Sequence, residues 1–228
     1  MTTTTPNPRT EPRPAPIRAA AVTLGAAVAL VAGIPAPAAA ASYSAPLQTA
    51  IEDLPVATEQ RDGYDRDLFE HWVDADGDGC DARYEVLIAE AEDAPTVGDG
   101  CSLSGGRWYS YYEGVSQYDT SDIDIDHMVP LAEAWDSGAH VWDSTRREAF
   151  ANDLDDYRTL VGVTDSVNQS KSDQDVAEWL PEQQQCRYLR EYVAVKIRWG
   201  LSVDSTEQAA MNDLAASCEN LVIEVEIA

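Results

Sequence analysis

One decapeptide, Asp122-Ile-Asp-Ile-Asp-His-Met-Val-Pro-Leu131, alternates acidic residues with isoleucines before it reaches a histidine. Such alternation is typical of a β-strand with one apolar and one polar face. Pro130 cannot continue a strand of this kind, and residues 131–135 have the composition of a short helix. We therefore expect a strand that buries its isoleucines and ends near His127.

A second compact strand is predicted downstream, at Thr159-Leu-Val-Gly-Val163. Thr164 or Asp165 can then cap a helix that carries Val167-Asn-Gln-Ser-Lys-Ser-Asp173. The order is strand, insertion, strand, helix.

These two segments together resemble an HNH-type endonuclease with a ββα-metal finger. The resemblance rests on Asp126-His127-x-Val-Pro-Leu and on Asn168-x-x-Lys171-Ser-Asp in the same order. A narrower resemblance links the chain to secreted actinobacterial HNH proteins, akin to the C-terminal domain of GmrSD-type restriction enzymes. It covers roughly residues 61–200 and is carried by Ile125-Asp-His, residues 132–135, Asn152-Asp-Leu154, Asn168-x-Ser-Lys171 and Glu178-Trp-Leu-Pro181.

The resemblance implies a catalytic set of His127, Asp126, Asn168 and Lys171. A neutral histidine, with an ordinary pKa of about 6.5, can take a proton from water. Asp126 and the Asn168 carbonyl are hard oxygen ligands for Mg²⁺ or Mn²⁺. Lys171 lies one helical turn after Asn168, where it could hold a phosphate oxygen.

One position departs from the HNH pattern. The middle asparagine of that pattern pins the loop that carries the histidine, and the expected position here holds Thr159. Asn152, within the insertion, is an alternative. Asp124 lies on the same strand face as Asp126 and is either a neighbour of the metal site or a solvated acid.

An acidic loop, Asp74-Ala-Asp-Gly-Asp-Gly-Cys-Asp-Ala-Arg-Tyr-Glu85, fits the D-x-D-x-D-G-x₅-E pattern of a calcium-binding loop. The candidate Ca²⁺ ligands are Asp74, Asp76, Asp78 and Glu85. The alternative is a structural turn that is anchored by a disulfide at Cys80, with Arg83 paired internally.

Residues 1–41 are predicted to be a secretory signal peptide. Arg9, Arg13 and Arg18 precede an apolar run, and small residues follow up to Ala41. The remaining chain carries 12 basic and 40 acidic side chains, a net charge of −28. We expect a secreted protein with no membrane attachment after cleavage.

Four cysteines in an exported chain favour two disulfides, for which three connectivities exist. We favour Cys80–Cys101 and Cys186–Cys218, since a helix over residues 182–199 and a second from Ser205 through Cys218 would bring the latter pair level. Gly200 is a plausible end for the first helix.

The chain is expected to be one α+β domain. It would comprise an N-terminal elaboration (42–119), an HNH nuclease core (120–181) and a C-terminal helix pair (182–228). Within the elaboration we expect helices at 47–60 and 84–92, and a hairpin that pairs 107–112 with 115–118.

Composition excludes some classes of protein. At 44% hydrophobic the chain is too apolar for disorder. No run after the leader approaches the ~20 apolar residues of a membrane span. The charge argues against a generic basic nucleic-acid binder, so a nuclease needs either cations gathered at its site (Arg107, Arg158, Lys171) or a salty habitat that screens repulsion.

The sequence as a whole predicts a secreted, metal-dependent HNH endonuclease that hydrolyses nucleic acid, with DNA as the expected substrate. The rival hypothesis is a non-catalytic extracellular calcium-binding module on a degenerate HNH scaffold.

Overall fold

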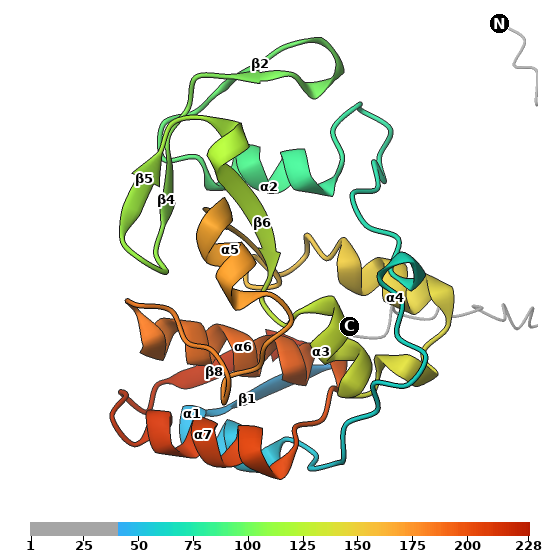
Figure 1. Ribbon diagram of the computed structural model, residues 1–228, viewed down its shortest axis with the longest axis vertical. Helices are drawn as coiled ribbons and strands as arrows, with labels where there is room; N and C mark the ends of the chain where they lie inside the picture. Colours follow the sequence, from blue (N-terminus) through green and yellow to red (C-terminus); the bar gives the residue numbers. More distant parts are fainter. Residues whose placement is uncertain (1–40) are drawn as a thin grey trace, which may run out of the picture. The chain divides into compact units, whose positions relative to one another are not determined.

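Two antiparallel strands and one helix form the centre of the computed structural model, which describes residues 41–228. Strand β6 (Ile123–His127) pairs with β7 (Leu160–Thr164), with Ile125 opposite Gly162. Helix α5 (Asp165–Lys171) follows β7 at once and packs against both strands (Figure 1). The predicted order of strand, insertion, strand and helix is therefore present, and both isoleucines of β6 are buried.

Gly162 lies at a close approach between β7 and the side chain of Glu90. Its N–H donates to Glu90 Oε2 at 2.6 Å, and a Cβ at this position would lie 2.7 Å from that oxygen. The approach ties β7 to the end of helix α2 (Ala82–Glu90).

The insertion between β6 and β7 is helical. The predicted short helix is α3 (Leu131–Asp136), which begins directly after Pro130. A 3-10 turn η4 (Ala139–Val141) and helix α4 (Ser144–Ala151) complete it. Asp143 caps α4, because its side chain accepts from the Arg146 N–H.

The N-terminal elaboration contains α2 and two small hairpins. One hairpin pairs β2 (Thr96–Val97) with β3 (Leu103–Ser104), and the turn η2 (Asp99–Cys101) connects the two strands. The predicted hairpin is β4 (Trp108–Ser110) with β5 (Val115–Gln117), shorter than expected. It is shorter because Tyr111 and Tyr112 leave the strand and turn into the core. The turn η3 (Thr120–Asp122) leads into β6.

The C-terminal part packs against the first residues described. Helices α6 (Gln185–Trp199) and α7 (Ser205–Ala215) contact each other and α1 (Leu47–Asp53). Strand β1 (Ser42–Pro46) pairs antiparallel with β8 (Val222–Glu226), a sheet that was not predicted. Gly200 ends α6 in the left-handed conformation, as expected.

Three predicted helices were too long, since α6 begins at Gln185 in place of residue 182, and α1 and α7 end early. Helix α1 ends at Asp53, since Pro55 forces the residue before it into an extended conformation. The chain then runs extended, and Ala57 N–H donates to Val203 O. Helix α7 ends at Ala215, so Cys218 lies in the turn after it.

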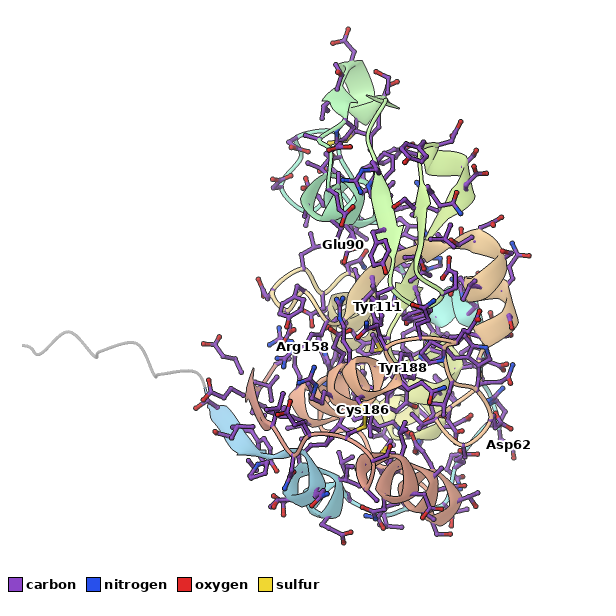
Figure 2. All side chains as sticks on the ribbon, turned by 90° about the vertical axis from the view of Figure 1, so that its left-hand side faces the viewer. Asp62, Glu90, Tyr111, Arg158, Cys186 and Tyr188 are labelled. Atoms are coloured by element: carbon purple, nitrogen blue, oxygen red, sulfur yellow. A yellow bond between two sulfur atoms is a disulfide. The ribbon has the colours of Figure 1, made fainter. Side chains whose placement is uncertain are left out.

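Both predicted disulfides are confirmed. Cys80 is bonded to Cys101, and Cys186, in the first turn of α6, is bonded to Cys218 (Figure 2).

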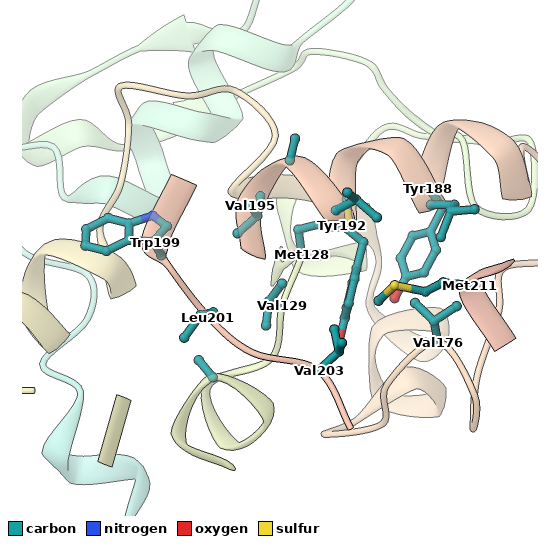
Figure 3. Packing of buried hydrophobic residues seen from close by; sticks show 14 of the residues in the cluster. Met128, Val129, Val176, Tyr188, Tyr192, Val195, Trp199, Leu201, Val203 and Met211 are labelled. Carbon is teal, nitrogen blue, oxygen red and sulfur yellow. The ribbon is translucent and has the colours of Figure 1, made fainter. Parts of the chain in front are cut away.

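The main hydrophobic core lies between α6 and the elements around it. Tyr188, Tyr192 and Trp199 of α6 pack with residues from the β6–α3 connection, the loop after α5 and α7 (Figure 3). A smaller core under α2 contains Leu87, Trp108 and the isoleucines of β6. The described residues fall in one compact unit of seven helices and four small two-stranded sheets, which confirms the α+β class. The predicted leader, residues 1–41, lies outside the described residues apart from Ala41.

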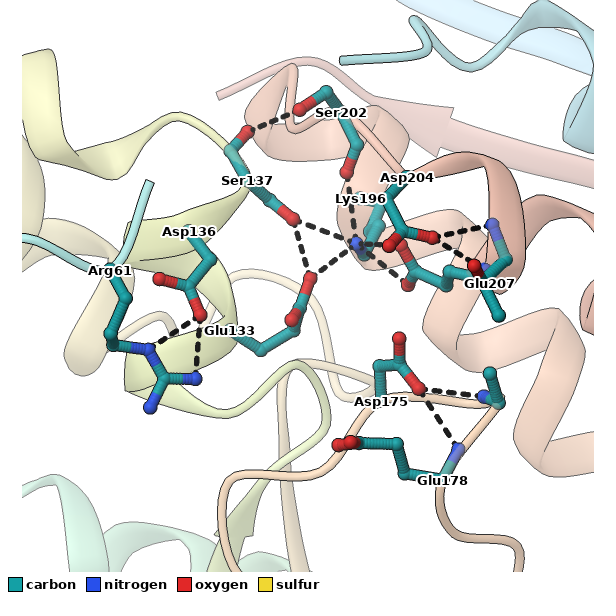
Figure 4. A network of polar contacts seen from close by, with 12 residues as sticks. Arg61, Glu133, Asp136, Ser137, Asp175, Glu178, Lys196, Ser202, Asp204 and Glu207 are labelled. Carbon is teal, nitrogen blue, oxygen red and sulfur yellow. Dashed lines mark hydrogen bonds and ion pairs between the residues drawn. The ribbon is translucent and has the colours of Figure 1, made fainter. Parts of the chain in front are cut away.

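A buried ion-pair network fixes α3 against α6 and α7. Lys196 Nζ donates to Glu133 Oε1 at 2.7 Å and to Glu207 Oε2 at 2.8 Å, and it also reaches Ser137 and Ser202 (Figure 4). Burial raises the pKa of Glu207, and Lys196 opposes that rise. The network holds in place the helix that borders the candidate site.

Candidate functional site

A pocket of about 510 Å³ opens where β6 ends. Its walls come from the end of β6, the start of α3, helix α5 and the segment around the 3-10 turn η1 (Arg66–Leu68). The lining residues are Tyr64, Arg66, Ile125, Asp126, His127, Pro130, Leu131, Ala132, Asn168, Gln169, Ser172 and Asp173. Three of the four predicted catalytic residues are therefore brought together.

Asp126 is buried at the base of this pocket. Lys171 Nζ donates to both of its carboxylate oxygens at 2.7 Å, and the Tyr112 hydroxyl donates to Oδ2 at 2.6 Å. Burial raises the pKa of Asp126, and the lysine opposes that rise. Burial also raises the pKa of Tyr112 well above its ordinary value, so its hydroxyl remains a donor.

His127 is held in a single orientation. Its Nε2 lies 2.9 Å from the carbonyl oxygen of Ala151, which can only accept, so Nε2 carries the proton. The lone pair of the neutral ring is then on Nδ1. Trp72, 5.6 Å away between ring centroids, and Phe150 at 6.4 Å pack beside the ring.

Burial lowers the pKa of His127 to about 3, because the charged imidazolium would lose its hydration. The ring is thus neutral throughout the neutral pH range. The neutral ring has one fixed N–H and one unprotonated lone pair, and the same lowered pKa makes it a weaker base than a free imidazole.

Asn168 lies on α5 and is partly exposed to the pocket. Its Nδ2 is 3.2 Å from Asp124 Oδ2, so Asp124 is a neighbour of the site and orients the amide. With the nitrogen turned toward Asp124, the carbonyl oxygen is the group left for a ligand.

Lys171 does not line the pocket. The side chain is fully buried, and Nζ also donates to the backbone carbonyls of His127 and Met128 at 2.8 and 3.1 Å. The structure therefore gives Lys171 a positioning role at the end of β6 in place of the predicted contact with a phosphate.

The two positions that were considered for the middle asparagine, Asn152 and Thr159, both make hydrogen bonds that connect segments around His127. Asn152 accepts from Val73 N–H and donates to the carbonyls of Glu70 and Glu148, which joins the end of α4 to the segment that packs on His127. Thr159 is buried, and its carbonyl accepts from Met128 N–H at 2.9 Å.

The two arginines predicted to gather at the site lie elsewhere. Arg107 is paired with Glu92 and Asp93, and Arg158 with Asp156. Neither lines the pocket.

Sequence reasoning missed three contributors to the site, namely Tyr112, Trp72 and the Ala151 carbonyl. Each reaches Asp126 or His127 from a distant part of the chain. The tyrosine pair next to the predicted turn at 113–114 was the one available signal, because two large aromatic side chains at a turn must find a core.

The acidic loop has features of both interpretations. Carboxylate oxygens of Asp74, Asp76 and Asp78 lie within 4.8 Å of one another, and Glu85 lies similarly close to Asp78. Burial and the three aspartates raise the pKa of Glu85. No α-helix leads directly into the loop, since among the described residues only the 3-10 turn η1 lies between α1 and Asp74.

The features expected of a structural turn anchored by a disulfide are also present in the acidic loop. Cys80 is bridged to Cys101, and Arg83 donates to the carbonyls of Thr120 and Ile123. Asp81 caps α2 through the N–H groups of Arg83 and Tyr84.

Within residues 41–228, no helix is both long and apolar enough to cross a membrane.

Comparison with known proteins places this arrangement in a family. A secreted protein of Arthroderma benhamiae, described as uncharacterized, is 41% identical over 160 residues, which are 69% of this chain and 77% of that protein. No solved structure matches the chain. Residues 81–214 match the family described as "GmrSD restriction endonucleases, C-terminal domain", whose name indicates a nuclease-related role and a nucleic-acid substrate. The chain belongs to this family of restriction-endonuclease C-terminal domains.

Proposed function

We propose that this protein is a secreted, metal-dependent endonuclease of the HNH type that hydrolyses phosphodiester bonds in nucleic acid, with DNA as the expected substrate. The observation that carries the proposal is the orientation and location of the His127 ring. Its Nε2–H is fixed on Ala151 O, and the ring lines the same pocket as Asp126 and Asn168. The family supplies the substrate class.

In this proposal β6, β7 and α5 are the ββα-metal core, within the nuclease core of residues 120–181. Residues 42–119 are the elaboration that contributes Tyr112 and Trp72. Residues 182–228 contribute α6, whose aromatic side chains support the base of the site.

The donor set fits Mg²⁺ or Mn²⁺. A carboxylate offers about four lone-pair positions, and the hydrogen bonds from Lys171 and Tyr112 use three of those on Asp126. One position on Oδ1 remains, and Asn168 adds a neutral oxygen. When bound, the ion supplies Lewis-acid stabilisation of charge at the phosphate and the leaving oxygen.

The residues of the chain divide the remaining work. His127 Nδ1 accepts the proton of the attacking water, and the Ala151 carbonyl keeps the ring from turning. Lys171 and Tyr112 hold Asp126 in a fixed rotamer. Asp124 turns the Asn168 amide so that its oxygen faces the pocket.

Export agrees with three observations. The two disulfides need an oxidising compartment, the leader-like residues 1–41 precede the fold, and the Arthroderma benhamiae relative is named as secreted.

A cleavage assay tests the proposal. Purified protein should nick a supercoiled plasmid with Mg²⁺ or Mn²⁺ and should be inactive with EDTA; a labelled RNA in parallel distinguishes the substrates. If the folded, disulfide-bonded protein cleaves neither DNA nor RNA with Mg²⁺ or with Mn²⁺, the nuclease proposal is contradicted.

The carboxylates of the acidic loop support a proposed calcium site in addition to the proposed catalytic site. The same carboxylates also support the rival hypothesis of a non-catalytic calcium module. We expect Ca²⁺ at about 100 times its Kd to stabilise the wild type by about 2.7 kcal/mol. The double variant Asp76→Ala/Glu85→Ala should lose that stabilisation, because a bound ion stabilises only a fold that holds its site.

Thermal unfolding with and without Ca²⁺ measures the effect. The matched control is Asp213→Ala/Glu219→Ala, which removes two exposed carboxylates outside the loop and the same charge. Equal shifts in the loop variant and the wild type would show that residues 74–85 are a structural turn.

A further inference from the structure

Cations available to nucleic acid are scarce on this protein. Residues 42–228 carry twelve basic side chains and a net charge of −28. Both lysines are fully buried against carboxylates. Of the arginines, five are ion-paired with acidic residues: Arg61, Arg107, Arg158, Arg187 and Arg198.

Three more arginines serve the fold itself. Arg83, Arg146 and Arg147 donate to backbone carbonyls, and the last two also lie over tryptophan rings. Among the ten arginines of the described residues, only Arg66 and Arg190 have a side chain without a hydrogen bond or ion pair to the rest of the protein.

Arg66 is the one of these two that lines the catalytic pocket. It begins the turn η1 and is exposed, on the wall that also carries Tyr64. Arg190 lies on α6 and borders a separate pocket with Tyr157 and Val222.

The surroundings of Arg66 keep it free. Asp173, which also lines the pocket, is bound by Arg61 at 2.8 Å, and Arg61 also binds Asp136. Arg61 thus neutralises two carboxylates near the pocket, one of which would otherwise repel a phosphate. The neighbouring Asp65 is used locally, because it accepts from the Asp67 N–H.

Resting on the proposed nuclease function, we infer that Arg66 is the substrate-binding cation of this site and that its guanidinium binds a phosphate of the nucleic-acid backbone beside His127. A guanidinium matches the oxygens of a phosphate with two parallel N–H groups. Arg66 precedes residue 81, where the match to the family begins, so this contact belongs to the N-terminal elaboration of the chain.

The test compares Arg66→Ala with Arg190→Ala, which removes the same charge from the other unpaired arginine. We expect Arg66→Ala to raise KM about tenfold or more, since a charge-assisted hydrogen bond is lost. It should also reduce the slope of log KM against log salt by about one, the value for one phosphate contact. Arg66→Lys should restore the slope and part of the KM, and Arg190→Ala should behave as the wild type.

A binding arm separates this inference from the proposed function. Fluorescence anisotropy of a labelled oligonucleotide in EDTA reports affinity without cleavage. If the wild type binds but does not cut, the nuclease proposal fails while a weaker Arg66→Ala complex still supports the contact. Equal KM, affinity and salt slope for Arg66→Ala and Arg190→Ala would overturn the inference, as would a wild type that neither binds nor cuts.

Discussion

Replacing His127 with alanine is expected to lower the cleavage rate by about 10²–10⁴-fold, the range typical for loss of a general base. In the proposed mechanism the neutral ring, with its Nε2–H fixed on Ala151 O, gives the water a proton acceptor at Nδ1. Metal affinity should change little, because the imidazole is not among the proposed ligands. Single-turnover cleavage with saturating Mg²⁺, together with titration calorimetry of the metal, measures both quantities.

His140→Ala is the matched control. His140 lies outside the pocket and contacts the Trp135 carbonyl through Nδ1, so its loss should leave the rate unchanged. Full phosphodiesterase activity in folded His127→Ala would place the chemistry at another site of the nuclease, whereas a folded wild type without any activity would favour the non-catalytic calcium-module hypothesis.

Lys171→Met is expected to destabilise the protein by about 3–5 kcal/mol in EDTA, the usual consequence of removing one partner of a buried ion pair. Methionine has a similar length, so the loss of volume is small. What remains is the Asp126 carboxylate, with only Tyr112 to satisfy it, and two carbonyls without their donor. Denaturant unfolding, with EDTA present so that no cation takes the place of the lysine, gives the free energy of unfolding.

A second substitution separates the charge from the packing. In Lys171→Met/Asp126→Asn no charge is left buried at this position, and the asparagine can still accept from Tyr112. The double variant should therefore be more stable than the single variant by about 1 kcal/mol or more. A loss of less than about 1 kcal/mol for Lys171→Met alone would mean that the pair contributes little to holding the end of β6.

The elements of the fold that could be predicted are those that depend on patterns of neighbouring residues. Alternation in residues 122–127 defined β6, and a single proline defined the start of α3. The same proline rule, applied to Pro55, would have ended α1 at its observed length. Strand β8 was not predicted, because its partner is β1, at the other end of the chain.

The candidate site divides in the same way. Asp126, His127 and Asn168 could be found because their spacing follows the β6–β7–α5 order, and the pocket brings them together. The positioning role of Lys171 and the pairing of Arg107 and Arg158 could not be found, since any of the 40 acidic side chains was an available partner. Arg66 was missed because the sequence does not show that its side chain has no ion-pair partner; only the three-dimensional structure does.

The pairing of β1 with β8 has a consequence for how the chain completes its fold. Ser42 lies opposite Glu226, so the first strand to emerge from a ribosome or a translocation pore finds its partner last. Contacts between residues so distant along the chain close late, after the entropy of the long intervening loop has been overcome. During vectorial emergence β1 would therefore present an unpaired edge until residues 222–226 arrive, and assembly of the sheet would report that the chain has been delivered as far as β8.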